Sequence, residues 1–90
     1  MASMQRPRLQ AVQVLPGATL ALTFIDGQKL KLDMSQALRL YPGLQPLRQP
    51  HAFAGAVLGD AGWTVDWPAF DIQIGADTLL IDALHQTAID

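Results

Sequence analysis

The sequence predicts an α+β fold: a mostly antiparallel sheet of about five short strands, two or three short helices, and a C-terminal helix packed on the sheet. Three features lead to this prediction. Apolar and polar residues alternate in the first third of the chain, Pro and Gly interrupt its middle, and an apolar stripe with helical spacing closes it. The alternation indicates hairpins, and the stripe indicates a helix that covers one face of a sheet.

The ninety residues suit one small domain rather than two. Residues 1–8 are predicted to form a flexible, mildly basic arm that contains Arg6 and Arg8. Residues 1–3 precede a second methionine, Met4, and are interpreted as an expression-vector remnant. Residues 9–90 are predicted to form the single α+β domain.

The first three strands are expected in Leu9–Leu15, Ala18–Ile25 and Gln28–Asp33. Pro16-Gly17 predicts a type II turn between the first two, since Pro presets the first turn residue and Gly accepts a positive φ at the second.

The register of the second hairpin can be argued from its side chains. A two-residue Asp26-Gly27 loop would pair Phe24 with Lys29 and place the lysines on the apolar face. A three-residue loop that begins at Ile25 pairs Leu22 with Leu30, so the apolar faces agree. We therefore expect a type I turn followed by a bulge, with Gly27 in the left-handed region.

The middle of the chain predicts short elements. Ser35 is expected to be the N-cap of a helix over Gln36–Leu40. Leu44–Gln49 is expected to be an irregular connector, and Pro50 to begin a second short helix. A strand over Ala56–Leu58 follows.

The last third predicts two strands, Trp63–Trp67 and Phe70–Ile74, and then a helix from about Ala76 to His85. Ile81 lies off the apolar stripe of this helix, so the helix is either broadly buried or used in a contact. The stripe itself comprises Leu79, Leu80, Ala83 and Leu84.

Several short pieces occur together in a recognisable order: Leu22-Thr-Phe-Ile-Asp-Gly27, Leu32-Asp-Met-Ser35, Pro50-His-Ala-Phe53, Trp67-Pro68, and Asp71-x-x-Ile74-x-x-Asp77-x-Leu79-Leu80. In this order and spacing the chain resembles a small family of bacterial domains of unknown function, numbered twenty-four forty-two. Gln73 and Gly75 depart from the pattern, which more often has Asp and Ser there. The resemblance implies an α+β domain. Because some relatives are encoded beside small toxin-like proteins, it also implies a regulatory, antitoxin-like role. It implies no catalytic residues.

Composition narrows the function classes. Charged residues make up 16% of the chain, against about 25% in typical domains. Either the surface is rich in Gln, Thr and Ala, or part of it is buried against another chain, such as a second copy in a homodimer, and both explanations can hold. A net charge of −2 gives no bulk attraction to nucleic acid or anionic lipid. Without Cys, disulfides and thiolate metal sites are excluded, and a cytoplasmic location is expected. No apolar run is long enough to span a membrane.

The candidate reactive side chains have structural explanations. Asp66 and Asp71 flank Pro68 and could act as a carboxylate pair, but solvent-facing and turn-stabilising roles are expected. His51 and His85 fall near helix ends, where capping and dipole roles explain them. We predict no catalytic residues, no metal ligands and no cofactor.

Three hypotheses remain open. The first is a non-enzymatic module that binds another protein through an exposed sheet edge and through the apolar flank of the C-terminal helix, Leu80, Ile81 and Leu84. Trp63, expected to be the more exposed of the two tryptophans, is a further candidate contact. The second is a small nucleic-acid-binding regulator that uses Arg6, Arg8, Lys29 and Lys31. The third is a ligand-binding or enzymatic site around Trp67, Asp66 and Asp71.

Overall fold

The computed structural model describes residues 7–88 and divides them between two antiparallel sheets. The first sheet has the order β1 (Leu9–Leu15), β2 (Thr19–Phe24), β3 (Lys29–Asp33). The second has the order β4 (Val57–Gly59), β5 (Thr64–Trp67), β6 (Ile72–Gly75). The described chain therefore contains six strands in two sheets, and the prediction of one sheet with about five strands was wrong. The α+β class and the antiparallel pairing are confirmed.

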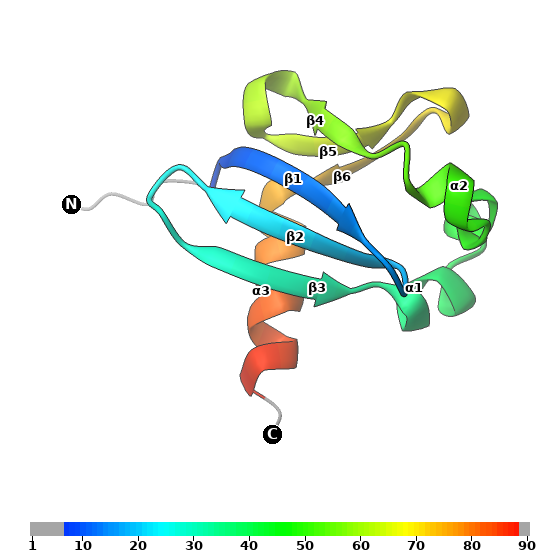
Figure 1. Ribbon diagram of the computed structural model, residues 1–90, viewed down its shortest axis with the longest axis horizontal. Helices are drawn as coiled ribbons and strands as arrows, with labels where there is room; N and C mark the ends of the chain where they lie inside the picture. The colour runs from blue at the N-terminus through cyan, green and yellow to red at the C-terminus, as the bar shows by residue number, and fades with distance from the viewer. Residues whose placement is uncertain (1–6, 89–90) are drawn as a thin grey trace.

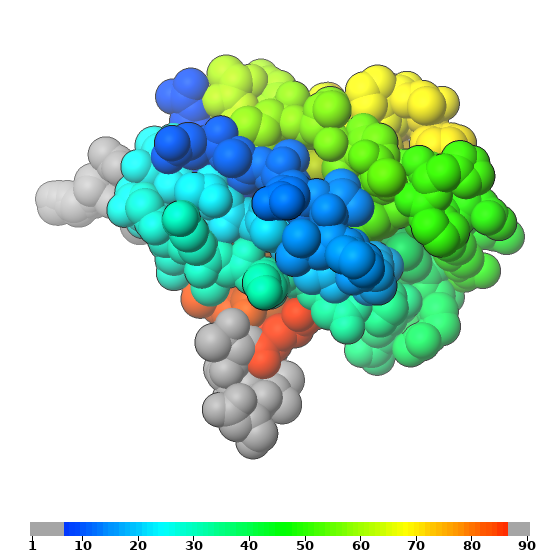
Figure 2. Space-filling model, viewed as in Figure 1, coloured from blue at the N-terminus to red at the C-terminus, as the bar shows by residue number. Residues whose placement is uncertain are grey.

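The helices lie at one end of the first sheet and behind it (Figure 1). Three short helices follow β3 at that end: α1 (Ser35–Leu40), the 3₁₀ helix η1 (Pro42–Arg48) and α2 (Pro50–Phe53). The C-terminal helix α3 (Ala76–Ala88) crosses behind the first sheet, contacts β3, and extends beyond its edge. In the space-filling view the first sheet covers most of α3, and the end of the helix emerges below it (Figure 2). The predicted end of this helix, at about His85, is three residues too early.

The β2–β3 hairpin has the predicted register. Leu22 pairs with Leu30, so the apolar side chains of both strands point to one face. The loop holds three residues, because the Phe24 N–H donates to the Gln28 carbonyl oxygen. Gly27 has a φ of 92°, in the left-handed region that the bulged turn requires.

The turn between β1 and β2 contains two residues with positive φ. Gly17, at 81°, takes the conformation predicted for a type II turn. Ala18 also lies in the left-handed region, at 56°, which was not predicted and is unfavourable for a residue with a Cβ.

Three local predictions need correction. Ser35 is the first residue of α1 rather than its N-cap; Met34 takes the cap position, and the Asp33 carboxylate accepts the Ser35 N–H at 2.8 Å. The expected irregular connector is the 3₁₀ helix η1. The fourth strand begins one residue later than expected, at Val57.

The expected strand over Phe70–Ile74 also begins later, at Ile72. Phe70 lies in the 3₁₀ turn η3 (Pro68–Phe70), and Asp71 adopts a left-handed φ of 56°. Trp67 therefore pairs directly with Ile72 across a four-residue turn.

The core lies between the two sheets and α3. Trp67 is buried, its ring lies 5.7 Å from that of Phe53, and its indole N–H donates to the Phe53 carbonyl oxygen at 2.9 Å. Gly62 packs against the Leu9 carbonyl so closely that a Cβ there would clash with it. The other fully buried large side chains are Phe24, Leu20, Leu22, Leu47, Leu79 and Val65.

Candidate functional site

The C-terminal helix presents two different apolar surfaces. Ala76, Leu79 and Ala83 recur at intervals of three and four residues, so they share the face that packs on the sheets, and all three are buried. Leu84 lies beside this face and is 42% exposed, whereas Ile81 lies nearly opposite it on the helix and is 60% exposed. Leu80 is half-buried between the two surfaces. We refer to Leu80, Ile81 and Leu84 as the α3 flank.

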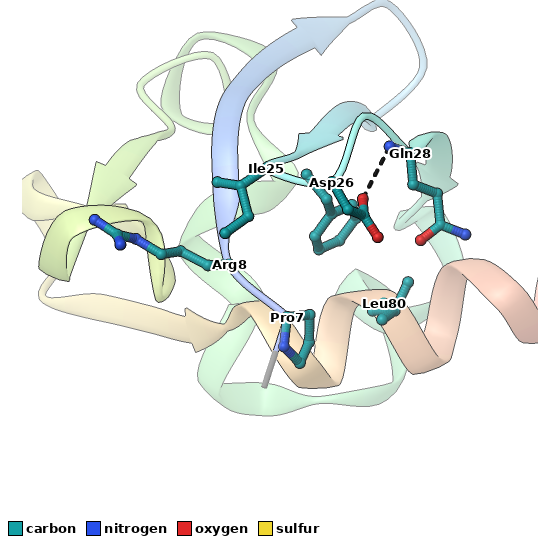
Figure 3. Close-up of a pocket in the computed structure, with 7 residues that line it drawn as sticks. Pro7, Arg8, Ile25, Asp26, Gln28 and Leu80 are labelled. Atoms are coloured by element: carbon teal, nitrogen blue, oxygen red, sulfur yellow. Dashed lines mark hydrogen bonds between the residues drawn. The ribbon is translucent and has the colours of Figure 1, made fainter. Parts of the chain in front are cut away.

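The α3 flank borders a small hollow between the β2–β3 turn and the start of β1 (Figure 3). This hollow has a volume of about 180 Å³, and Leu80 lines it together with Pro7 and Ile25. The Ile25 side chain is 59% exposed. Asp26 closes the turn above the hollow by accepting the Gln28 N–H at 3.0 Å. The hollow therefore brings the exposed Ile25 of the hairpin close to Leu80, the half-buried residue of the α3 flank.

Trp63 is half-buried, and part of its ring is covered by another residue of the chain. The Arg8 guanidinium lies 5.5 Å from the centre of the ring, a cation–π distance. The Arg8 Nε–H also donates to the Ala61 carbonyl oxygen at 2.7 Å. Trp63 and Arg8 thus join the start of β1 to the second sheet.

The predicted basic patch is only partly assembled. Lys29 and Lys31 are exposed on the outer face of the first sheet, opposite Thr23 and Ala21 of β2. Arg8 does not join them, because its guanidinium contacts Trp63 and Ala61. Its side chain points away from Asp26 and Gln28 of the β2–β3 turn (Figure 3). Arg6 lies outside the described residues.

The other two arginines lie near α1. The Arg48 guanidinium donates to the Leu38 carbonyl oxygen at 2.7 Å and to the Arg39 carbonyl oxygen at 3.1 Å. These carbonyls end α1 and have no partner within the helix, so Arg48 caps it.

Both members of the carboxylate pair considered from the sequence have structural roles. Asp66 lies on the outer face of β5, as predicted, and it accepts hydrogen bonds from Thr64 Oγ1 at 2.6 Å and Gln73 Nε2 at 3.2 Å. Asp71 occupies the left-handed position of the neighbouring turn. Trp67, between them in sequence, is packed in the core. The arrangement stabilises the β5–β6 hairpin.

His51 and His85 are both exposed, on α2 and in the last turn of α3. Within residues 7–88, no three His, Asp or Glu side chains are close enough together to hold a metal ion.

The surroundings of the Asp33 carboxylate lower its pKa. Its carboxylate accepts the Ser35 N–H and is also hydrogen-bonded to the Ser35 side chain. These two bonds, in that order of importance, hold the pKa of Asp33 below its usual value of 3.8.

Two features of the surface were not found from the sequence. One is a mostly apolar groove of about 510 Å³ between the β1–β2 turn and α2, which includes Val14, Leu47 and Phe53. The other is the contact of Gln86 with Asp33, described below. Both join segments that are distant in sequence, so no local pattern indicates them.

Comparison with known proteins identifies the family. The model of a family described as a protein of unknown function, DUF2442, matches residues 9–83. The chain belongs to the DUF2442 family. The match covers both sheets and most of α3.

A crystal structure of NE0471, a candidate DNA-binding protein from Nitrosomonas europaea, has a similar fold, with a TM-score of 0.80 and 30% sequence identity. The alignment covers 97% of this chain and 55% of that one, so this DUF2442 chain spans about half the length of NE0471. No curated protein matches the sequence. In the described residues, no helix combines the length and apolarity needed to cross a membrane.

Proposed function

We propose that this DUF2442 domain is a non-enzymatic module that binds another protein through the α3 flank. The observation that carries the proposal is the exposure of Ile81 and Leu84 beside the buried stripe of the same helix. An amphipathic helix in water normally turns polar residues toward solvent. Large apolar side chains gathered on an exposed flank are typical of an interaction surface.

The composition supports this proposal. Charged residues are only 16% of the chain, so fewer of them are available to keep a small domain in solution. The nearby Ile25 extends the apolar surface, and such surfaces supply the anchors of helix-mediated recognition.

The regulatory, antitoxin-like role that the family resemblance implies supports one partner class, a small toxin-like protein in the cytoplasm. A second copy of this chain is the other partner to test. Trp63 is a weaker candidate for the contact, since Arg8 already lies over its ring.

The test is affinity capture of the partner from the source cells, followed by reconstitution from purified proteins. Ile81→Lys is expected to weaken the reconstituted complex by at least about tenfold, because a charge would be buried at the interface. Val57→Lys is the matched control: Val57 is also exposed, at 46%, but lies on β4, where Lys would face Asp66. Equal affinities for the two variants would refute the proposal.

A second candidate function is DNA binding, which the similarity to NE0471 favours. Lys29 and Lys31 share one exposed face and could contact two phosphates. Each phosphate contact contributes about 0.9 to the slope of log affinity against log salt for duplex DNA, so the two lysines together account for about 1.8. Loss of this part of the slope in a Lys29→Glu, Lys31→Glu double variant would support DNA binding, and affinity independent of salt would exclude it.

A further inference from the structure

The outer strand of the first sheet has main-chain groups that point away from the sheet. β3 pairs with β2 on one side and is the last strand in the order. The Phe24 N–H donates to the Gln28 carbonyl oxygen and the Met34 N–H to the Ala18 carbonyl oxygen. Because main-chain direction alternates along an antiparallel strand, the N–H and C=O groups of Lys29, Lys31 and Asp33 face outward.

The Gln86 side chain closes one end of this row. Its Oε1 accepts the Asp33 N–H at 3.0 Å, and its Nε2 donates to the Asp33 carbonyl oxygen at 2.8 Å. One primary amide thus satisfies both outward groups of Asp33, as a residue of a neighbouring strand would do. No hydrogen bond to the outward groups of Lys29 and Lys31 is found between residues 7 and 88. We refer to these groups as the β3 edge.

We propose that the β3 edge accepts an extended acidic segment of a partner protein as a fourth strand of the first sheet. The N–H and C=O groups of Lys29 and Lys31 supply the main-chain hydrogen bonds, and Gln86 sets the end of the added strand. The Lys29 and Lys31 side chains lie on the outer face, so the residues opposite them on the added strand share that face.

The side chains specify the occupant. Residues directly opposite Lys29 and Lys31 are acidic, since opposite charges across a strand pair are stabilising. The residue between them points to the inner face, beside Leu30, which is half-buried, and is therefore apolar. The pattern of the segment is acidic–apolar–acidic.

Charge argues against a second copy of this chain as the occupant. Two β3 strands paired antiparallel would bring lysines of one copy opposite lysines of the other, and like charges directly opposite are destabilising. Lysine on an edge strand is a common device against such self-pairing. An acidic strand converts the same lysines into attractive contacts.

The inference rests on the proposed function only in that the bound molecule is a protein segment. The surface that binds it is the β3 edge and not the α3 flank. The probe is a display library of random seven-residue peptides, selected on the full chain. The expected result is enrichment of the acidic–apolar–acidic pattern. The enriched peptide, made synthetically, is expected to slow hydrogen exchange of the Lys29 and Lys31 amides at least tenfold.

Two variants then separate main-chain from side-chain recognition. Lys31→Pro removes one outward N–H, which β2 does not use, and Lys29→Glu with Lys31→Glu reverses the charge. Both are expected to lower the affinity for the peptide at least tenfold, whereas Ile81→Lys is expected to leave that affinity unchanged. Unchanged exchange at Lys29 and Lys31 in the wild-type chain, or a library without the pattern, overturns the inference. Loss of the cellular partner on Ile81→Lys alone would still uphold the proposed function.

Discussion

Helix α3 carries apolar residues on two sides, buried on one and exposed on the other. On the side facing the sheets, Leu79 is 1% exposed and Ala83 is fully buried. On the α3 flank, Ile81 is 60% exposed. Leu and Ile have similar hydrophobicity, so the difference arises from position alone: the first side folds the domain, and the second contributes little to folding. The comparison teaches that helical spacing alone does not separate the apolar residues that form the core from those that remain exposed.

The largest expected effect is on the buried side. Leu79→Ala should lower the free energy of unfolding by about 2–5 kcal/mol, because it leaves a cavity under the sheets. Ile81→Ala, the matched change on the α3 flank, should alter it by less than about 0.5 kcal/mol. Urea unfolding of both variants measures the difference. Similar losses would mean that the α3 flank also belongs to the core.

The next effect concerns the polar side of α3 that reaches β3. Gln86→Ala removes two hydrogen bonds to the main chain of Asp33 and should cost about 1–2 kcal/mol. Amide exchange at Asp33 should become faster. Gln36→Ala, on the exposed surface of α1, is the control and should change the stability by less than about 0.5 kcal/mol. No change at Gln86 would show that α3 is held by its apolar side alone.

The smallest effect is electrostatic. The pKa of Asp33 is lowered in the folded state by its hydrogen bonds from Ser35, so its stabilising contribution is present above the unfolded value near 3.8. The contribution is lost as pH falls through the lower folded pKa. Asp33→Asn should therefore cost under about 1 kcal/mol at pH 7, and the difference from wild type should shrink below about pH 4. A difference that stays constant from pH 7 to pH 2 would contradict this assignment.

Local patterns predicted the first sheet well. The alternation of Leu20, Leu22 and Phe24, with the charge of Lys29, fixed the hairpin register before the structure was known. Side chains two residues apart share a face, so a wrong register would have buried a charge. Short-range chemistry was sufficient here.

The second sheet depended on information that the local pattern lacks. Phe70 continues the alternation of Ile72 and Ile74, yet Pro68 and the left-handed Asp71 place it in a turn. The division into two sheets follows from contacts between distant segments, which periodicity does not encode.

In the candidate site, too, local patterns were informative and long-range contacts could not be predicted. Helical spacing correctly predicted that Ile81 lies off the apolar stripe, but it placed Leu84 within the stripe, and the structure leaves both exposed. The contact of Gln86 with Asp33 joins residues 53 positions apart and could not be predicted. The position of Arg8 could not be predicted either, because its cation–π contact with Trp63 is also long-range.

The most direct test of the central claim is the chemical accessibility of residue 81 in the complex. The chain has no cysteine, so Ile81→Cys introduces a single thiol whose alkylation rate reports exposure. A Val57→Cys variant serves as the reference. The account predicts rapid alkylation at both sites in the isolated protein and, once the partner is bound, slowing of at least tenfold at position 81 only. An unchanged rate at position 81 in the saturated complex would contradict it.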